Sequence, residues 1–429
     1  MQKELKMKKY SKLSSAEREA LLDSLLVKYN EYCSRGLKLD LSRGKPNAEQ
    51  LDVSQQLLAY PITPEDTIGK GGVDCRNYGI LDGIPEMKHL FAEMLEVPDE
   101  YVFVGGNSSL QLMYDTLVRA MLFGLNGSER PWCRESGLKW ICVVPGYDRH
   151  FNITDKLGFE LLTVNMTSTG PDMDEVERLA RDPKVKGIWC VPKYSNPTGN
   201  TYSDETVRRL AKMECAAPDF RIMWDNAYVV HDLTERTDPL LNIFTEAEKY
   251  GNADRIIAFT STSKITFPGA GVAAMATTPA NLKQMLPYIG AQTIGYDKIN
   301  QLRHVKYLKN SANVHQHMMQ LAALVGRKFK ITLAALEELD GLGIAEWTKP
   351  NGGYFISLDV TTGSAKRVFE LMKNAGVTLT AVGATFPKGI DPNDRNLRLA
   401  PTYPSDDELR LACEILILSV KIAALEALA

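Results

Sequence analysis

Hydrophobic residues recur at helical spacing near the start of the chain. Leu21, Leu22 and Leu25 are three or four positions apart, which places them on one face of a helix. The preceding segment, Ser14–Glu17, has the form of a capping box, in which a serine hydroxyl and a glutamate satisfy free backbone N–H groups. The pattern predicts an N-terminal helix over residues 15–35.

Between residues 85 and 310, short apolar runs alternate with amphipathic helical stretches. This alternation is typical of βαβ units, which build a mostly parallel sheet with helices on both faces. We therefore predict an α/β, doubly wound domain here. The expected helices are Glu86–Leu95, Ser108–Leu122, Arg149–Leu157 and Ser203–Met213, and the expected strands are Trp140–Val144, Leu161–Val164, Gly187–Val191, Ile222–Trp224 and Ile256–Thr260.

The alternation of short strands and helices ends near residue 310. A long helical stretch, from about Lys298 to Leu339, leads out of it, and strands are expected at Gly352–Leu358 and Leu397–Ala400. A second capping box, Ser405–Glu408, precedes the last helix. We predict an N-terminal segment at 1–60 that forms part of a small domain, a large domain at 61–310, and the rest of the small α+β domain at 311–429.

Composition narrows the possible functions. The chain has 429 residues, enough for two or three structural units, and its net charge of -3 provides no basic face for nucleic acid or a membrane surface. The polar start and the lack of a long apolar stretch predict neither a signal peptide nor a spanning helix. Seven scattered cysteines without a C-x-x-C pair favour reduced thiols. We expect a cytoplasmic protein.

One lysine stands at the end of an apolar run. Lys264 follows the strand expected at Ile256–Thr260 and precedes the turn Phe267–Gly271. Open α/β sheets bind ligands at the carboxyl ends of their strands, and a desolvated lysine can attack carbonyl groups. Taken alone, however, Lys264 is most simply a surface lysine after an edge strand.

Two other strands end in motifs that change this interpretation. Asn196–Gly199 reads Asn-Pro-Thr-Gly, and Asp225–Tyr228 reads Asp-Asn-Ala-Tyr. Each motif alone is weak, because Asn-Pro-Thr-Gly is usually only a turn. In this order with Ser261–Lys264, they resemble the signature of the fold-type I, pyridoxal-phosphate-dependent aminotransferases (class I/II). The resemblance runs from about Arg43 to Arg398, and it is strongest to bacterial aspartate aminotransferases of the divergent subgroup Ic.

The resemblance implies a cofactor, pyridoxal 5'-phosphate (PLP), in a large domain with a seven-stranded-type, mostly parallel sheet. Lys264 would hold the cofactor as an aldimine and later carry a proton between the substrate α-carbon and the cofactor. Asp225 would keep the pyridine nitrogen protonated, so that the ring accepts electrons. Asn196 and Tyr228 would hydrogen-bond the phenolic oxygen of the ring.

The phosphate site is expected where small residues and hydroxyls precede a helix. Ser108 and Ser109 follow Val104–Asn107, and free backbone N–H groups at a helix start bind anions. Ser261 and Ser263 are the other expected phosphate contacts. Many relatives carry an arginine shortly after the lysine, but Gly269–Ala273 has none. The phosphate site is therefore expected to be less cationic than in those relatives.

Two tyrosines are assigned by the resemblance. Tyr147 occupies the position at which relatives stack an aromatic ring on the cofactor. Tyr78 lies in Asn77–Gly83, which is similar to a loop that reaches the phosphate across a dimer interface in this family. The resemblance thus implies a homodimer. No metal is expected, because His315 and His317 are two residues apart on a helix and their rings diverge.

Arg398 indicates the substrate class, because an arginine in an apolar strand is rarely buried without a partner. Its planar guanidinium suits the α-carboxylate of an amino acid, and Gly44 matches a family glycine that closes over that carboxylate. A dicarboxylic substrate needs a second cation. The sequence offers three candidates without choosing among them, namely Lys298, Arg303 and Lys306.

These observations predict reversible amino-group transfer between L-aspartate and 2-oxoglutarate, through PLP and pyridoxamine phosphate. The alternatives on the same fold are an aminotransferase for another amino acid, aromatic or alanine, and a PLP lyase. A PLP-binding transcriptional regulator is disfavoured, because only about 40 residues precede Gly44 and the net charge is slightly negative.

Overall fold

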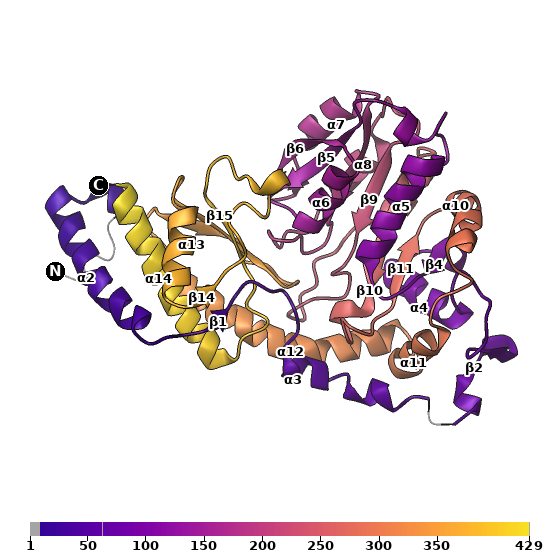
Figure 1. Cartoon of the computed structure of the whole chain (residues 1–429), viewed down its shortest axis with the longest axis horizontal. Helices are drawn as coiled ribbons and strands as arrows, with labels where there is room; N and C mark the ends of the chain where they lie inside the picture. Colours follow the sequence, from indigo (N-terminus) through magenta and orange to yellow (C-terminus); the bar gives the residue numbers. More distant parts are fainter. Residues whose placement is uncertain (1–8, 62, 429) are drawn as a thin grey trace.

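An eight-stranded sheet organises the larger part of the chain (Figure 1). The computed structural model describes residues 9–61 and 63–428. The five strands from β10 to β6 run parallel, whereas β11 and β7 are antiparallel to their neighbours. In spatial order the strands are β4 (Val102–Val104), β11 (Ala273–Ala276), β10 (Ile256–Ser261), β9 (Arg221–Asp225), β8 (Val185–Cys190), β5 (Lys139–Val144), β6 (Glu160–Thr167) and β7 (Gly170–Pro171).

Helices cover both faces of this sheet, as the alternating pattern predicts. Strand β9 is buried on both sides, since Ile222 and Trp224 belong to one hydrophobic cluster and Met223 belongs to another. The Met223 side is covered by α5 (Ser109–Phe123), α6 (Asp148–Lys156) and α10 (Pro279–Gln292). The Trp224 side is covered by α4 (Pro85–Leu95), α7 (Met173–Ala180), α8 (Asp204–Lys212), α9 (Ile243–Glu248) and α11 (Lys298–Leu308).

The single helical stretch expected from Lys298 to Leu339 is wrong, because the chain breaks after α11. Lys309 adopts a left-handed conformation with φ of 63°, and the Asn310 side chain caps the next helix. That helix, α12 (Ser311–Leu336), continues into a short 3₁₀ turn at Glu337–Leu339. It runs from the large sheet into the smaller unit, where Phe329 joins a separate hydrophobic cluster (Figure 1).

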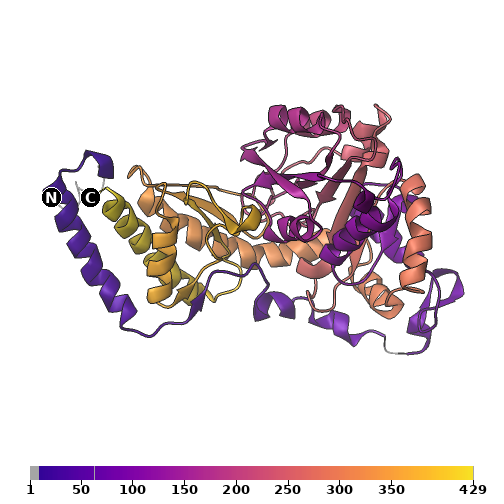
Figure 2. The same cartoon turned by 45° about the horizontal axis from the view of Figure 1, so that its top comes forward.

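The smaller unit combines segments from both ends of the described chain, and α2 (Ser15–Cys33) packs against α14 (Asp406–Ala427) (Figure 2). Its sheet has the order β12-β13-β15, and the expected strand Gly352–Leu358 begins only at Ile356. Both predicted capping boxes are confirmed, at Ser14 and at Ser405. The elements are α2 (Ser15–Cys33), β1 (Leu39–Asp40), β12 (Ala345–Trp347), β13 (Ile356–Val360), α13 (Ala365–Asn374), β14 (Val377–Thr378), β15 (Asn396–Leu399) and α14 (Asp406–Ala427).

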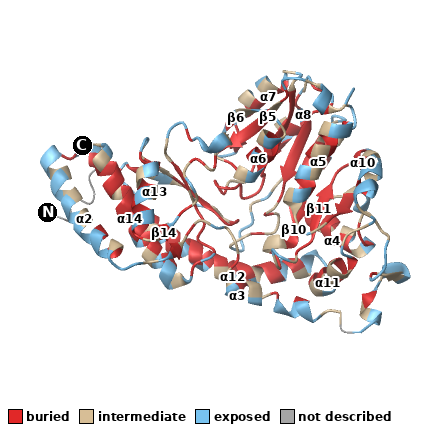
Figure 3. Cartoon of the chain, viewed as in Figure 1, coloured by how far each residue is buried: buried red, intermediate tan, exposed pale blue. Residues whose placement is uncertain are grey.

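Burial follows this division into two packed regions (Figure 3). Buried residues concentrate in the large sheet, in α12 and in α14, whereas α2 buries only Tyr29 and Tyr32. Three short elements, α3 (Ala48–Asp52), β2 (Ile68–Gly69) and β3 (Val73–Asp74), lie between the N-terminal helix and α4. None of the helices in residues 9–61 and 63–428 is long and apolar enough to cross a lipid bilayer.

Candidate active site

A cavity of about 570 Å³ opens where several parallel strands end. Asp225 is the last residue of β9, Ser261 is the last residue of β10, and Tyr147 follows β5. Residues of the smaller unit close the other side of the cavity, among them Gly44, Phe355 and Arg398. The position agrees with the rule that open α/β sheets bind ligands at the carboxyl ends of their strands.

Lys264 lies in this cavity, on a 3₁₀ turn that directly follows β10. Hydrogen bonds of Thr262 to Val272 hold the turn, with the Thr262 N–H donating to the Val272 carbonyl at 2.8 Å. The Lys264 Nζ lies 5.2 Å from the centre of the Tyr228 ring. Burial lowers the pKa of Lys264, and the negative charge of Asp225 only partly opposes this shift. The site therefore favours a neutral, nucleophilic amine.

Asp225 is held by a histidine that the sequence analysis missed. His150 Nε2 lies 2.9 Å from Asp225 Oδ2, and the His150 ring stacks on Trp189 at 4.4 Å between centroids. The other carboxylate oxygen, Oδ1, is buried and has no hydrogen-bond partner. One oxygen is thus fixed by His150, while the other remains available to a buried ligand group.

The expected anion cradle is present at the N-terminus of α5. Ser108 caps this helix by accepting a hydrogen bond from the Gln111 N–H at 3.4 Å, and Ser109 is its first residue. Across the cavity, Ser261 Oγ lies 3.0 Å from Ser263 Oγ. Ser263 in turn donates to the Asn107 carbonyl at 3.4 Å, which joins the two halves of the cradle. Free N–H groups and hydroxyls gathered in this way bind an anion such as phosphate.

Arg398 projects from β15 toward the same cavity, with only 10% of its side chain exposed. Its Nη1 lies 3.2 Å from Asp148 Oδ1 and 3.3 Å from Asn196 Oδ1. The guanidinium carbon lies 5.0 Å from the centre of the Phe355 ring, and the buried Nε has no hydrogen-bond partner. Arg398 is therefore positioned by three contacts and still has a free donor.

Two tyrosines, Tyr147 and Tyr228, also line the cavity. Burial raises the pKa of Tyr147 to about 12, with a further contribution from the charge of Asp225. Burial likewise raises the pKa of Tyr228. Both hydroxyls therefore stay protonated at neutral pH and can donate hydrogen bonds. The Tyr147 ring also contacts His150 edge to face, with 4.9 Å between centroids.

Comparison with known proteins agrees with this arrangement. A family model described as aspartate amino-transferase matches residues 13–429. The chain belongs to this aminotransferase family. An aspartate aminotransferase of Corynebacterium glutamicum is 46% identical over 98% of this chain and 99% of its own length. The crystal structure of an aspartate transaminase from the same species superposes with a TM-score of 0.96 at 45% identity, covering 99% of this chain and all of that one.

A more distant structure shows how widely the fold is shared. The α-aminoadipate aminotransferase LysN of Thermus thermophilus, in complex with N-(5'-phosphopyridoxyl)-L-leucine, has a TM-score of 0.72 at 21% identity. The alignment covers 94% of this chain and 96% of LysN. The predicted fold-type I architecture is thus confirmed, with one two-residue edge strand, β7, added to the seven strands expected.

The residues of this aminotransferase suit PLP. The partnerless oxygen of Asp225 can face a protonated pyridine nitrogen, and the cradle at α5 can take a phosphate. Besides Lys264, the cavity lining contains three arginines, Arg43, Arg149 and Arg398, and two carboxylates, Asp148 and Asp225. This excess of positive charge suits an anionic cofactor together with an anionic substrate.

The cavity gathers eleven of the twelve predicted site residues, and Tyr78 is the exception. Tyr78 is 84% exposed and lies outside the lining. Its proposed contact belongs to a partner subunit, so it stays a prediction. The residues in the lining are Gly44, Ser108, Ser109, Tyr147, Asn196, Asp225, Tyr228, Ser261, Ser263, Lys264 and Arg398.

The three candidate cations for a second carboxylate lie outside the cavity that this single chain forms, and their role stays a prediction. Lys298 is buried and donates to the Gly79 carbonyl at 3.0 Å. Arg303 Nε donates to the Tyr60 carbonyl at 2.7 Å, and Lys306 lines the same small crevice beside Tyr60. Among the described residues that line the cavity, none of these three cations appears.

The sequence analysis missed several residues that line or support the site. His150 is three residues after Tyr147 at the start of a helix, so helical spacing alone could have placed it beside Tyr147. Asp148 and Arg149 lie between these two residues. Arg43 precedes the recognised Gly44, and Phe355 lies in the segment before β13. The contact of Asp148 with Arg398 depends on how the two units meet, which spacing does not reveal.

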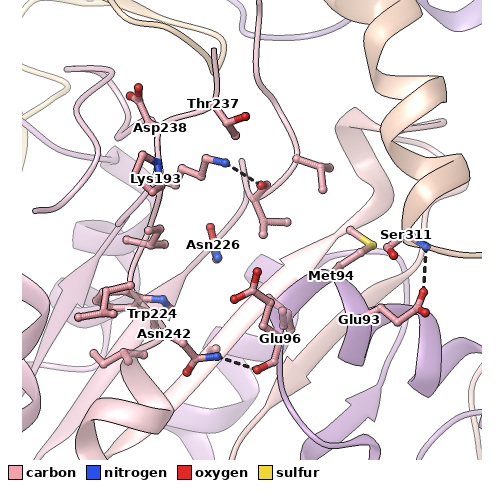
Figure 4. A pocket seen from close by; sticks show the side chains of 18 of the residues that line it. Glu93, Met94, Glu96, Lys193, Trp224, Asn226, Thr237, Asp238, Asn242 and Ser311 are labelled. Atoms are coloured by element: carbon pink, nitrogen blue, oxygen red, sulfur yellow. Dashed lines mark hydrogen bonds between the residues drawn. The ribbon is translucent and has the colours of Figure 1, made fainter. Parts of the chain in front are cut away.

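A second cavity of about 330 Å³ lies on the other side of β9, where Trp224 and Asn226 point (Figure 4). Its lysine, Lys193, donates to the Val229 carbonyl at 3.1 Å and lies 3.3 Å from an Asp232 oxygen. The amine there is already paired, in contrast to Lys264. Of these two cavities, the one that contains Lys264 is therefore the candidate active site.

Proposed function

We propose that this aminotransferase is PLP-dependent and transfers the amino group of L-aspartate reversibly to 2-oxoglutarate. The observation that carries the proposal is the meeting of Lys264 and Asp225, from the large sheet, with Arg398, from the smaller unit, in one cavity. An amine, a carboxylate and a carboxylate-binding guanidinium are the groups that amino-acid transamination requires. The similarity to the aspartate aminotransferase of C. glutamicum supports aspartate as the donor.

When bound, PLP supplies an aldehyde for covalent capture of amines and a ring that accepts electrons from the substrate α-carbon. Lys264 supplies the capturing amine, because burial lowers its pKa and favours the neutral form. After a substrate amine takes its place, the Lys264 amine would be free to remove the proton from the α-carbon and deliver it to the cofactor. Asp225, fixed by His150, stabilises positive charge on the ring nitrogen.

Arg398 orients the amino acid through its α-carboxylate. Asp148 and Asn196 occupy Nη1, which leaves the partnerless Nε edge of the guanidinium open. A carboxylate can bind this edge through two parallel hydrogen bonds. The Asn196 amide can then serve both Arg398 and the cofactor's phenolic oxygen, and the protonated Tyr228 hydroxyl can donate to that oxygen as well.

We further infer a homodimer, as the family resemblance implies. Large hydrophobic side chains are exposed together on α5 and α10, including Leu122, Phe123 and Tyr288. The Phe123 and Tyr288 rings stack at 4.3 Å between centroids, so the apolar side chains of the two helices meet there. Exposed apolar patches of this kind are typical of protein interfaces, and the exposed Tyr78 loop would reach the partner's site from such an interface.

The substrate proposal is tested by comparing aspartate, alanine and phenylalanine as donors, through the absorbance change of the cofactor in the first half-reaction. We expect aspartate to exceed alanine in catalytic efficiency by about 100-fold, because a buried charge left without its partner is costly. Equal efficiencies, or a preference for phenylalanine, would assign the protein to another amino-acid substrate.

A further inference from the structure

We propose that Arg43 forms the subsite for the distal carboxylate of the dicarboxylic substrates, so that this one side chain selects aspartate and 2-oxoglutarate. The inference rests on the proposed function, and it replaces the three cations of α11 considered from the sequence. Arg43 lines the active-site cavity directly beside Gly44.

The backbone that carries Arg43 is fixed to the strand that carries Arg398. The Leu41 N–H donates to the Thr378 carbonyl at 2.8 Å, and the Ala400 N–H donates to the Leu41 carbonyl at 3.1 Å. Thr380 Oγ1 donates to the Ser42 carbonyl at 2.9 Å. Segment 41–44 therefore belongs to the smaller unit together with the end of β15, and its geometry relative to Arg398 is well defined.

Gly44 brings Arg43 close to the carboxylate-binding arginine. A Cβ atom at Gly44 would lie 2.2 Å from Phe355 Cζ, so the Gly44 backbone packs directly on the Phe355 ring. The Arg398 guanidinium lies 5.0 Å from the centre of the same ring. Gly44 and Arg398 therefore both contact the Phe355 ring, and Arg43 is the residue directly before Gly44. Arg43 thus lies on the side of the cavity that the smaller unit forms.

Arg43 differs from the other two arginines of the cavity because its guanidinium is not paired with a carboxylate. Arg398 is paired with Asp148 at 3.2 Å, and Arg149 Nε lies 3.9 Å from the same carboxylate. Within residues 9–61 and 63–428, the Arg43 side chain has neither an ion pair nor a hydrogen bond. A free guanidinium can accept a ligand carboxylate without first giving up an internal partner.

A side chain that can change its conformation suits two substrates of different length. Aspartate and 2-oxoglutarate differ by one carbon between their carboxylates, so a single rigid cation cannot meet both equally well. Arg43 is exposed, and no internal hydrogen bond or ion pair holds its side chain among the described residues. With Arg398 held in place by Asp148, Asn196 and Phe355, the α-carboxylate has one position, and a flexible Arg43 can follow the shorter or the longer chain.

Binding and kinetics of the holoenzyme test this subsite. The kinetic readout is the ratio of kcat/KM for aspartate to that for asparagine, a near-isostere without the distal charge. The binding readout is the Kd of succinate, a dicarboxylate, relative to that of butyrate. For Arg43→Gln we expect both ratios to fall by about 30-fold, the low end for losing one partner of a charge pair. Arg43→Lys, which keeps the charge without the planar fork, should lie between Arg43→Gln and the wild type.

Arg181→Gln and Arg410→Gln are the matched controls, because both side chains are exposed and neither is among the residues that line the cavity. Each also removes one positive charge, and each should leave the aspartate-to-asparagine ratio within about threefold of the wild type. Arg149 lines the same cavity, so Arg149→Gln tests the competing assignment. If Arg149→Gln lowers the ratio more than Arg43→Gln does, the assignment of Arg43 is wrong. An unchanged ratio in Arg43→Gln, with wild-type preference for aspartate intact, also overturns it. No preference for aspartate in the wild type would instead overturn the proposed function.

Discussion

At the scale of the residue, the site depends on a lysine that the fold makes hard to protonate. Lys264 is surrounded by the end of β10, the Tyr228 ring and the cavity wall, and burial lowers its pKa below the usual value of 10.5. The unfolded chain therefore binds more protons than the folded chain between the lowered pKa and 10.5. The free energy of unfolding of the cofactor-free protein rises with pH across that window.

The first prediction follows from this rise of stability with pH. In the cofactor-free protein, Lys264→Met removes the charge that burial disfavours, so we expect the variant to unfold at a higher temperature than the wild type at neutral pH. The difference should shrink as pH rises through 10.5, because the wild-type lysine becomes neutral in both states above that pH. Thermal unfolding followed by circular dichroism measures the difference.

The exposed Lys366 on α13 offers a control, since Lys366→Met should change stability little at any pH in this range. A Lys264→Met protein that is less stable than the wild type at neutral pH, or whose advantage grows with pH, would contradict the desolvation of Lys264.

At the scale of the element, the irregular segment between β1 and α3 helps to position Arg398. Gly44 lets this segment lie against Phe355, which supports Arg398 from the other side. Its close approach, and not an unusual φ angle, is the reason for a glycine here, because the ring leaves no room for a Cβ. The substrate arginine therefore depends on a residue more than 350 positions earlier in the chain.

The second prediction is that Gly44→Ala impairs substrate use without impairing cofactor binding. The added Cβ must displace the Phe355 ring and with it Arg398, and misplacing a positioning group by about 1 Å costs about 100-fold in rate. We expect kcat/KM for aspartate to fall by about that factor while bound cofactor, read from its absorbance, stays at the wild-type level.

Gly269→Ala is the matched control, because a Cβ there would meet no atom within 4 Å. Equal activity of Gly44→Ala and Gly269→Ala would show that Phe355 moves aside freely and does not position Arg398.

The elements themselves were largely predictable from the sequence, because strands buried on both faces appear as short apolar runs. The strand β11 was missed, since Ala273–Ala276 contains three alanines and a methionine and lacks the β-branched residues typical of strands. The break after α11 depends on the left-handed Lys309, and no glycine marks it. The motif residues meet in one cavity, as the sequence indicates, whereas the contact of His150 with Asp225 and the positions of Arg43 and Arg149 in the lining became visible only in the tertiary arrangement.

At the scale of the whole molecule, α12 joins two hydrophobic clusters and the active site lies between them. Lys264, Asp225 and the serine cradle belong to the large sheet, whereas Arg398, Gly44 and Arg43 belong to the smaller unit. The division of the chain at residues 60 and 310 stays a prediction. A second copy of the chain would be the third contributor to the site. If the apolar side chains on α5 and α10 form the dimer interface, the Tyr78 loop of that copy would reach the site.

The third prediction concerns this shared site. Lys264→Ala and Tyr78→Ala chains should each be inactive or weak as homodimers. Mixed after mild dissociation, they should regain activity, because half of the sites in a hybrid dimer combine an intact Lys264 with an intact Tyr78 from the other chain. Sedimentation confirms the dimer, and turnover with aspartate measures the recovery. A fully active monomer, or mixtures no more active than their components, would contradict the shared site.

The central claim is that Lys264 is the residue to which PLP is covalently attached. Reduction of the purified holoenzyme with borohydride, followed by proteolysis and mass spectrometry, identifies the modified residue directly. We expect the phosphopyridoxyl group on the peptide that contains Lys264, and no label in a Lys264→Ala protein treated in the same way. A label on another lysine, or a holoenzyme whose cofactor is not fixed by borohydride, would contradict the account.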